Sequence, residues 1–121
     1  MASIGSKTWV IPGGQIPLDS DGPEPENTSR DEVCLLNSGA AEARLEITIY
    51  YGDRDPVGPY VLTVPPRRVR NVRFNDLIDP EALPLGTLYA AVIEANVPIV
   101  VQFGRLDSRR GTSAGFIPYS E

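Results

Sequence analysis

Hydrophobic and polar residues alternate most regularly in residues 42–51, which read EARLEITIYY. A period of two places apolar side chains on one face of an extended chain and polar side chains on the other. The two faces hold Leu45, Ile47, Ile49 and Tyr51 on one side and Glu46, Thr48 and Tyr50 on the other. A turn-rich loop at 52–59 leads to a second extended run at 60–64, so we predict a β-hairpin of residues 42–51 with 60–64.

Further apolar runs predict additional strands at 7–11, 31–37, 87–95 and 97–108. The run at 87–95 also fits a helix, because alanine is frequent in it. We prefer a strand, since Asn96, Val97 and Pro98 leave room for little more than a hairpin turn before the next run. Residues 12–29 contain four prolines and four acids without periodicity, which predicts a long surface loop that is a candidate for ligand binding or for clamping a neighbour.

Arginine is concentrated in residues 65–77, which read PPRRVRNVRFNDL. Neither face of an extended chain is cleanly apolar there, and a bulge near Asn71 would bring Val69, Val72 and Phe74 to the core side. We therefore predict an edge strand or a bulged strand with a basic outer side. It is followed by a turn or one short helical turn at 75–84, capped by Asn75 or Asp76.

Short strands separated by proline and glycine turns predict an all-β fold. The chain has 121 residues with 12 prolines and 11 glycines, which fits one domain rich in turns. We predict a single-domain antiparallel β-sandwich, jelly-roll-like, of about seven or eight short strands in residues 1–108. Residues 109–121 are small and polar, and we predict a flexible C-terminal tail there.

Composition argues against catalysis and against a metal or cofactor. The chain has no histidine and one cysteine, so the commonest general base and the usual zinc ligands are missing. Residues 111–115 match G-x-S-x-G, but that nucleophile motif needs a histidine partner. Cys34 is predicted to be a buried structural thiol, and a lone cysteine without a signal peptide or membrane span indicates a cytoplasmic protein.

Charge is unevenly distributed along this acidic chain, whose formal net charge is −5. Residues 1–60 carry ten acids and four bases, whereas residues 61–121 carry six acids and seven bases. The clustered arginines therefore have three competing roles: contact with a neighbouring subunit or partner, a solvated strand face, or a nucleic-acid patch. An isoelectric point near 4.7 argues against a dedicated nucleic-acid domain, so we expect weak DNA binding at most. The interface candidates are Arg67, Arg68, Arg70 and Arg73.

Several polar or aromatic residues are candidates for binding a ligand or a partner. Trp9 is either a core residue or a contact residue, since tryptophan offers a large ring and one donor. Arg105, Asp107 and Arg109, at the end of the last predicted strand, form either an internal salt network or a contact with an acidic ligand or subunit. The candidates are Trp9, Asn75, Asp76, Arg105, Asp107 and Arg109.

Several phrases in order resemble the sensory rhodopsin transducer family over nearly all of residues 7–110. They are GPEPEN, EITIYYGDRDPVGPY, VPPRRVRNVRFNDL and VPIVVQFGRLDSR, with Trp9 before them. The resemblance implies a β-sandwich, a cytoplasmic homotetramer and a non-enzymatic signalling role with a receptor such as a sensory rhodopsin. It also implies, as an alternative, a sensor of a small carbohydrate-like ligand or a weak DNA-binding regulator. Members often carry histidine at the positions of Arg30 and Phe103, so a function that rests on those histidines does not carry over.

Overall fold

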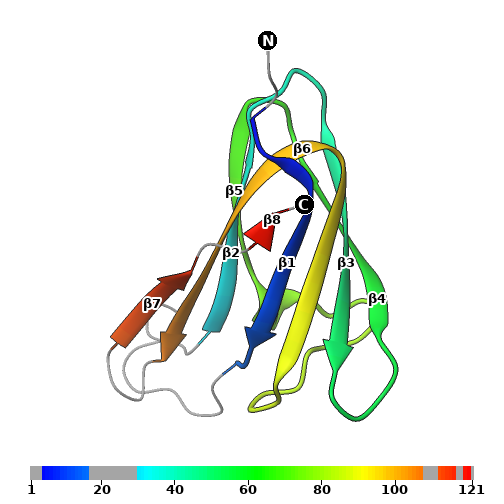
Figure 1. Ribbon diagram of the computed structural model, residues 1–121, viewed down its shortest axis with the longest axis vertical. Helices are drawn as coiled ribbons and strands as arrows, with labels where there is room; N and C mark the ends of the chain where they lie inside the picture. Colours follow the sequence, from blue (N-terminus) through cyan, green and yellow to red (C-terminus); the bar gives the residue numbers. More distant parts are fainter. Residues whose placement is uncertain (1–3, 17–29, 108–111, 117–118, 121) are drawn as a thin grey trace.

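The computed structural model describes residues 4–16, 30–107, 112–116 and 119–120, and it describes backbone alone for Arg30, 105–107, 112–116 and 119–120. This part of the chain forms eight strands and one 3₁₀ turn, all strand pairs being antiparallel (Figure 1). The predicted all-β antiparallel sandwich is therefore confirmed. The elements are β1 (Ser6–Gly14), β2 (Arg30–Asn37), β3 (Ala43–Tyr51), β4 (Val57–Val64), β5 (Arg68–Arg73), η1 (Phe74–Asp76), β6 (Tyr89–Asp107), β7 (Thr112–Phe116) and β8 (Tyr119–Ser120).

One strand, β6, belongs to both layers of the sandwich. Its first half pairs with β1 and β3 in a sheet of order β4-β3-β6-β1-β8, which we call sheet A. Its second half pairs with β2 and β7 in a sheet of order β5-β2-β6-β7, which we call sheet B. Figure 1 shows β6 arching over one end of the molecule between the two layers.

The bend in β6 corrects the predicted hairpin of residues 87–95 with 97–108. Both runs are strands, as predicted, but each pairs with different neighbours and, within the described residues, they do not pair with each other. Pro98 has no N–H to donate to a ladder, and the Oδ1 atom of Asn96 accepts a hydrogen bond from the backbone N–H of Arg44 (2.7 Å). The turn residues therefore mark a corner between sheets rather than a hairpin loop.

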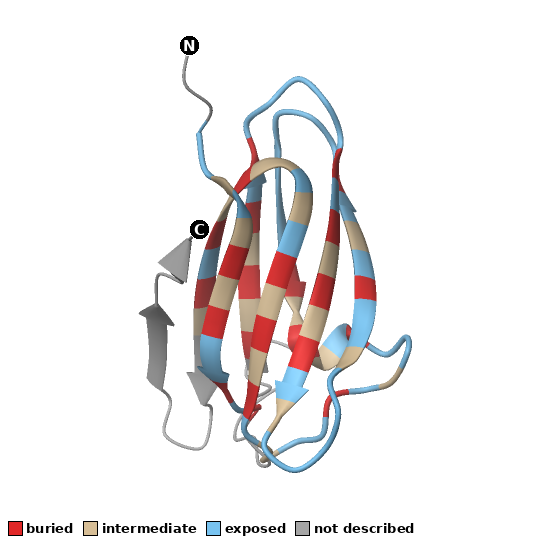
Figure 2. Cartoon of the chain, turned by 45° about the vertical axis from the view of Figure 1, so that its right-hand side comes forward, coloured by how far each residue is buried: buried red, intermediate tan, exposed pale blue. Residues whose placement is uncertain are grey.

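Buried and less buried residues alternate along the strands, as the colouring in Figure 2 shows, so one set of side chains faces the space between the sheets. Leu45, Ile47 and Ile49 are fully buried, and β3 pairs with β4 with Leu45 opposite Leu62. The predicted hairpin of 42–51 with 60–64 is thus confirmed. Aromatic packing adds to the core, because the ring of Phe74 lies 5.5 Å from that of Tyr89 in an edge-to-face arrangement.

The arginine-rich strand β5 contains no bulge. It pairs with β2 in unbroken register, from Glu32 opposite Arg73 to Asn37 opposite Arg68. Val72 is 7% exposed but Val69 is 66% exposed, so the predicted bulge is wrong. The bulge was expected in order to place Phe74 in the core. Phe74 instead belongs to η1, where it is fully buried. Among the described strands β5 pairs with β2 alone, which confirms the prediction of an edge strand.

Three smaller expectations concern the turn, the loop and the tail. No side chain caps η1, whose N-cap residue is Arg73, so the predicted Asn75 or Asp76 cap is wrong. The predicted loop at 12–29 begins later, since β1 continues to Gly14, and residues 17–29 lie outside the described residues. The backbones of β7 and β8 pair with β6 and β1. Flexibility of residues 109–121 and the division at residue 108 stay predictions.

None of the described segments forms a helix with the length and apolar character that crossing a bilayer requires.

Candidate functional site

Four arginines lie in β5 or directly before it, and we call Arg67, Arg68, Arg70 and Arg73 the arginine edge. Arg73 pairs with Asp76 at 3.0 Å. Arg68 and Arg70 instead donate to backbone carbonyls, those of Arg67 (3.0 Å) and Thr63 (2.8 Å). Arg67 has a φ angle of 57°, an uncommon left-handed conformation for a residue other than glycine. Thus, in the described part of the chain, one of the four guanidinium groups is neutralised by a carboxylate.

A small apolar patch borders the arginine edge on the outer face of sheet B. Leu36 lies opposite Val69 on one side and opposite Val100 on the other. Leu36 is 39% exposed, Val69 is 66% exposed, and Val100 is half-buried. Directly opposed residues share a face of the sheet, so these three side chains form one row across β5, β2 and β6.

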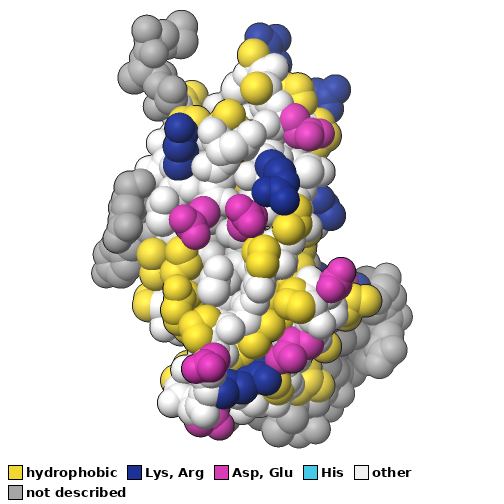
Figure 3. Space-filling view, turned by 90° about the vertical axis from the view of Figure 1, so that its right-hand side faces the viewer, with side chains coloured by type: hydrophobic (Ala, Val, Ile, Leu, Met, Phe, Trp, Pro, Cys, Tyr) yellow, Lys and Arg dark blue, Asp and Glu magenta, His cyan; other side chains and the backbone are white. Residues whose placement is uncertain are grey.

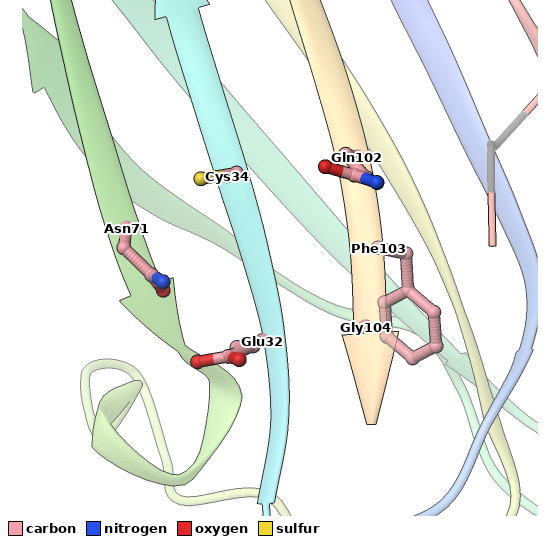
Figure 4. Close-up of a pocket in the computed structure, with 6 residues that line it drawn as sticks. All are labelled: Glu32, Cys34, Asn71, Gln102, Phe103 and Gly104. Atoms are coloured by element: carbon pink, nitrogen blue, oxygen red, sulfur yellow. The ribbon is translucent and has the colours of Figure 1, made fainter. Parts of the chain in front are cut away.

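A shallow groove of about 130 Å³ lies further along the same face. Asn71, Cys34 and Gln102 form one row across β5, β2 and β6, and Figure 4 shows the carboxylate of Glu32 over the space between β2 and β5. Cys34 is half-buried, so the prediction of a buried structural thiol is wrong. The reason is the alternation of β2, in which Val33 and Leu35 face the core and Cys34 faces outward. The remaining lining residues are Phe103 and Gly104.

Asp31 is a buried carboxylate at the start of β2 that the sequence reasoning did not single out. Its Oδ2 atom accepts hydrogen bonds from the backbone N–H of Gln15 (2.8 Å) and from the hydroxyl of Tyr89 (2.8 Å). Asp31 is 0% exposed, and the two donors come from beyond the end of β1 and from the start of β6. Asp31 therefore ties three strands together at one end of the sandwich.

Asn37 is the corresponding buried polar residue at the other end of β2. Its Nδ2 atom donates toward the carbonyls of Ala41 (2.8 Å), Val64 (3.1 Å) and Pro65 (3.3 Å). Its Oδ1 atom accepts from the N–H of Gly39 (3.0 Å). Val64 is the last residue of β4, and Pro65 follows it in the connection to β5. The hydrogen bonds of Asn37 therefore hold the segment that leads into the arginine edge.

Tyr60 links β4 to the segment that follows η1. Its hydroxyl donates to the backbone carbonyl of Glu81 (2.5 Å). Burial, with smaller contributions from Tyr51 and Glu81, raises the pKa of Tyr60 to about 12. Nearby, Arg54 pairs with the Glu81 carboxylate at 2.8 Å and lies 4.2 Å from the centroid of the Tyr51 ring. These contacts hold the 77–88 segment against β4.

The predicted binding residues do not converge on one place. Trp9 is 7% exposed, and its indole N–H lies 3.0 Å from the carbonyls of both Ser6 and Ile99, which fits the core role weighed for it. Asn75 is half-buried in η1, and Asp76 is exposed. The backbones of residues 105 and 107 belong to β6, while their side chains and residue 109 lie outside the described part. A ligand role for these residues stays a prediction.

The outer face of sheet A is less uniform in charge than the arginine edge. Figure 3 views the side on which β3 and β4 lie and shows acidic, basic and hydrophobic side chains interspersed. Glu46 lies directly opposite Glu94, and Arg44 lies 3.6 Å from Glu46. No group of three or more potential metal ligands is found within the described ranges.

The position of Asp31 could have been noticed in the sequence, because it shares the inward parity of Val33 and Leu35. A charged residue in register with core residues is rarely buried without specific partners. The apolar row gave no such signal, since Leu36 reads in the sequence like any core residue of β2.

Known proteins resemble this chain along most of its length. A model of the Anabaena sensory rhodopsin transducer family matches residues 4–119. The solved structure titled Anabaena sensory rhodopsin transducer is 54% identical, with a TM-score of 0.75, and the match covers 84% of this chain and 99% of that one. The crystal structure of Thermotoga maritima 1070 is 29% identical, with a TM-score of 0.85, and the match covers 98% of this chain and 97% of that one. The search of curated proteins returned no match.

The family match spans the strand that carries the arginine edge, and it agrees with the resemblance found in the sequence. The chain belongs to the Anabaena sensory rhodopsin transducer family.

Proposed function

We propose that this chain is a non-enzymatic signalling protein that relays a signal by binding a partner protein. The observation that carries the proposal is the family match over residues 4–119. The 54% identical relative is named for a sensory rhodopsin, so a receptor of that kind is the proposed partner. Cytoplasmic location and a homotetramer accompany the proposal as predictions from the sequence. Of the roles weighed for the arginines, we adopt contact with a partner protein in place of the subunit interface.

The arginine edge is the proposed partner-binding surface. Arg68 and Arg70 are exposed and donate to carbonyls, which carry no formal charge. Guanidinium groups form strong paired hydrogen bonds with carboxylates, so an acidic partner gains contacts here that the described part of the chain does not make. The chain as a whole has a net charge of −5, which limits this attraction to one side of the molecule.

Titration against Anabaena sensory rhodopsin in lipid nanodiscs tests the proposal. Calorimetry should detect saturable binding, with the Anabaena transducer as the positive control. The Arg44→Gln variant changes a surface charge on β3, away from the arginine edge, and should bind as the wild-type chain does. A chain that gives no binding under conditions where the Anabaena transducer binds would contradict the proposed receptor role.

The groove beside Cys34 favours a second candidate function, a sensor of a small carbohydrate-like ligand. Glu32, Asn71 and Gln102 offer acceptors and donors within a concave space of about 130 Å³. A panel of sugars and polyols followed by nuclear magnetic resonance should then shift the amide signals of these residues. Shifts confined to other parts of the chain would remove this candidate.

A further inference from the structure

We propose that the free side of β5 accepts an extended acidic segment of a partner protein as an added antiparallel strand. The proposal rests on the partner-binding function above and specifies its chemistry. Three features of β5 support it. They are a backbone edge that no described strand pairs with, two arginines (Arg68 and Arg70) without a carboxylate partner in the described chain, and an apolar row on the face opposite to these two arginines.

The backbone of β5 is the first feature. β5 hydrogen-bonds to β2 on one side, and no described strand pairs with its other side. An edge strand presents N–H and C=O groups that an extended peptide can pair with. The six residues from Arg68 to Arg73 keep an unbroken register with β2, so this edge is regular along its length.

Charge is the second feature. Arg68 and Arg70 lie two residues apart and point to the same face, and both are exposed. Arg70 reaches the carbonyl of Thr63 on β4, whereas Arg73 already pairs with Asp76. An added strand with acidic side chains two residues apart can place one carboxylate beside each of these two guanidinium groups.

The apolar row is the third feature. Val69 lies between Arg68 and Arg70 in sequence, so its side chain points to the outer face of sheet B. Leu36 and Val100 continue that row. An apolar residue of the added strand, placed between its two acidic residues, would cover Val69. The edge therefore selects a segment in which acidic and apolar residues alternate.

A second copy of the same strand is a poor occupant. Two β5 strands paired edge to edge would bring arginines of one copy against arginines of the other, and opposed like charges destabilise a strand pair. Charges on an edge strand also discourage such pairing in general. The acidic segment of another protein meets neither obstacle.

A fluorescent six-residue peptide of alternating glutamate and valine, as long as β5, provides the test. Fluorescence anisotropy of the intact chain should show saturable binding. R68Q/R70Q should weaken binding about tenfold or more, because two charge-assisted contacts are lost. R44Q, on β3, should leave it unchanged. The same peptide with N-methyl groups on alternate amides keeps its charge but cannot form one set of backbone hydrogen bonds, and it should bind at least about tenfold more weakly.

Several results would overturn strand addition. They are no binding of the alternating peptide, equal binding of the N-methylated peptide, and equal weakening by R44Q. A fall in molecular mass of R68Q/R70Q by light scattering would show that a second copy covers the edge, and this also counts against the proposal. If wild-type chain binds the rhodopsin nanodiscs but fails these peptide tests, the partner-binding function stands and strand addition alone is wrong.

Discussion

The two ends of β2 each bury one polar side chain, and the two side chains have opposite hydrogen-bonding roles. Asp31 accepts from the N–H of Gln15 and the hydroxyl of Tyr89. Asn37 donates chiefly toward carbonyls, those of Ala41, Val64 and Pro65. Both residues are 0% exposed. The comparison teaches that the surrounding donors or acceptors decide which buried group is tolerated at each end.

Replacing Asn37 by aspartate should have the largest effect. A carboxylate would face three carbonyl oxygens in a buried site, and we expect a loss of about 3–5 kcal/mol in the free energy of unfolding at neutral pH. Burial and repulsion would raise the pKa of the introduced carboxyl, so stability should be greatest in acid and fall as the pH rises. Urea unfolding at several pH values measures both. Asn96→Asp is the matched control, because that exposed side chain accepts from the N–H of Arg44 through its oxygen.

Replacing Asp31 by alanine should be the next most damaging change. The N–H of Gln15 and the hydroxyl of Tyr89 would lose their shared acceptor, at a cost of about 3 kcal/mol. Thermal unfolding should show the loss, and Asp76→Ala, at an exposed pair with Arg73, should show little. Equal losses in the two variants would mean that burial of the carboxylate is unimportant.

Tyr60 is a further buried hydrogen-bonding residue, and unlike Asn37 it is a donor that can lose its proton. Its folded-state pKa is about 12, above the ordinary value of 10.0, so the folded chain holds this proton more tightly than the unfolded chain. The resulting stability is complete below pH 10 and is lost as the pH rises toward 12, by about 2–3 kcal/mol in total. Unfolding in urea across this range measures it. Tyr60→Phe should remove this part of the alkaline loss, and identical pH profiles for the two proteins would contradict the assignment.

The smallest expected effect comes from replacing Tyr89 by phenylalanine. One donor to Asp31 is lost while the N–H of Gln15 still bonds to the carboxylate, and we expect a loss of about 1 kcal/mol. The packing of the ring against Phe74 is retained. Tyr50→Phe, at a 43% exposed position, provides the control, and a Tyr89→Phe loss as large as that of Asp31→Ala would show that the hydroxyl carries the whole contact.

The sequence was informative wherever one face of a strand was clearly apolar. Residues 42–51 and their hairpin partner were predicted for that reason. β5 has no clearly apolar face, and there the sequence led to a bulge that the unbroken register with β2 does not contain. The sequence was not informative in β2, because both faces of this strand carry apolar residues. Val33 and Leu35 lie on the buried face, and Cys34 and Leu36 lie on the outer one. Only the neighbouring strands decide which face is buried. The corner in β6 was missed because a hairpin and a change of sheet use the same residues, Asn96 to Pro98.

The candidate site was predictable in composition but not in its contacts. The clustering of arginines in residues 65–77 pointed to a basic strand at an edge. Asp76 neutralises Arg73, and the carbonyl of Thr63 accepts a hydrogen bond from Arg70. Neither partner follows from the strand pattern. The groove depends on three strands from distant parts of the sequence, so the side chains that meet there could not be listed in advance.

The shared strand β6 has a consequence for how the chain folds during synthesis. Residues 1–88 contain the hairpin of β3 with β4 and the distant pair of β2 with β5, but the strand that joins these pairs and receives β1 comes later. Neither sheet can be completed until residues 89–107 have left the ribosome. Pairings between distant segments slow folding, and unpaired strands are prone to aggregate. A nascent chain of this protein therefore passes most of its synthesis with its central strand missing and with β1, β2 and β3 lacking their β6 partner.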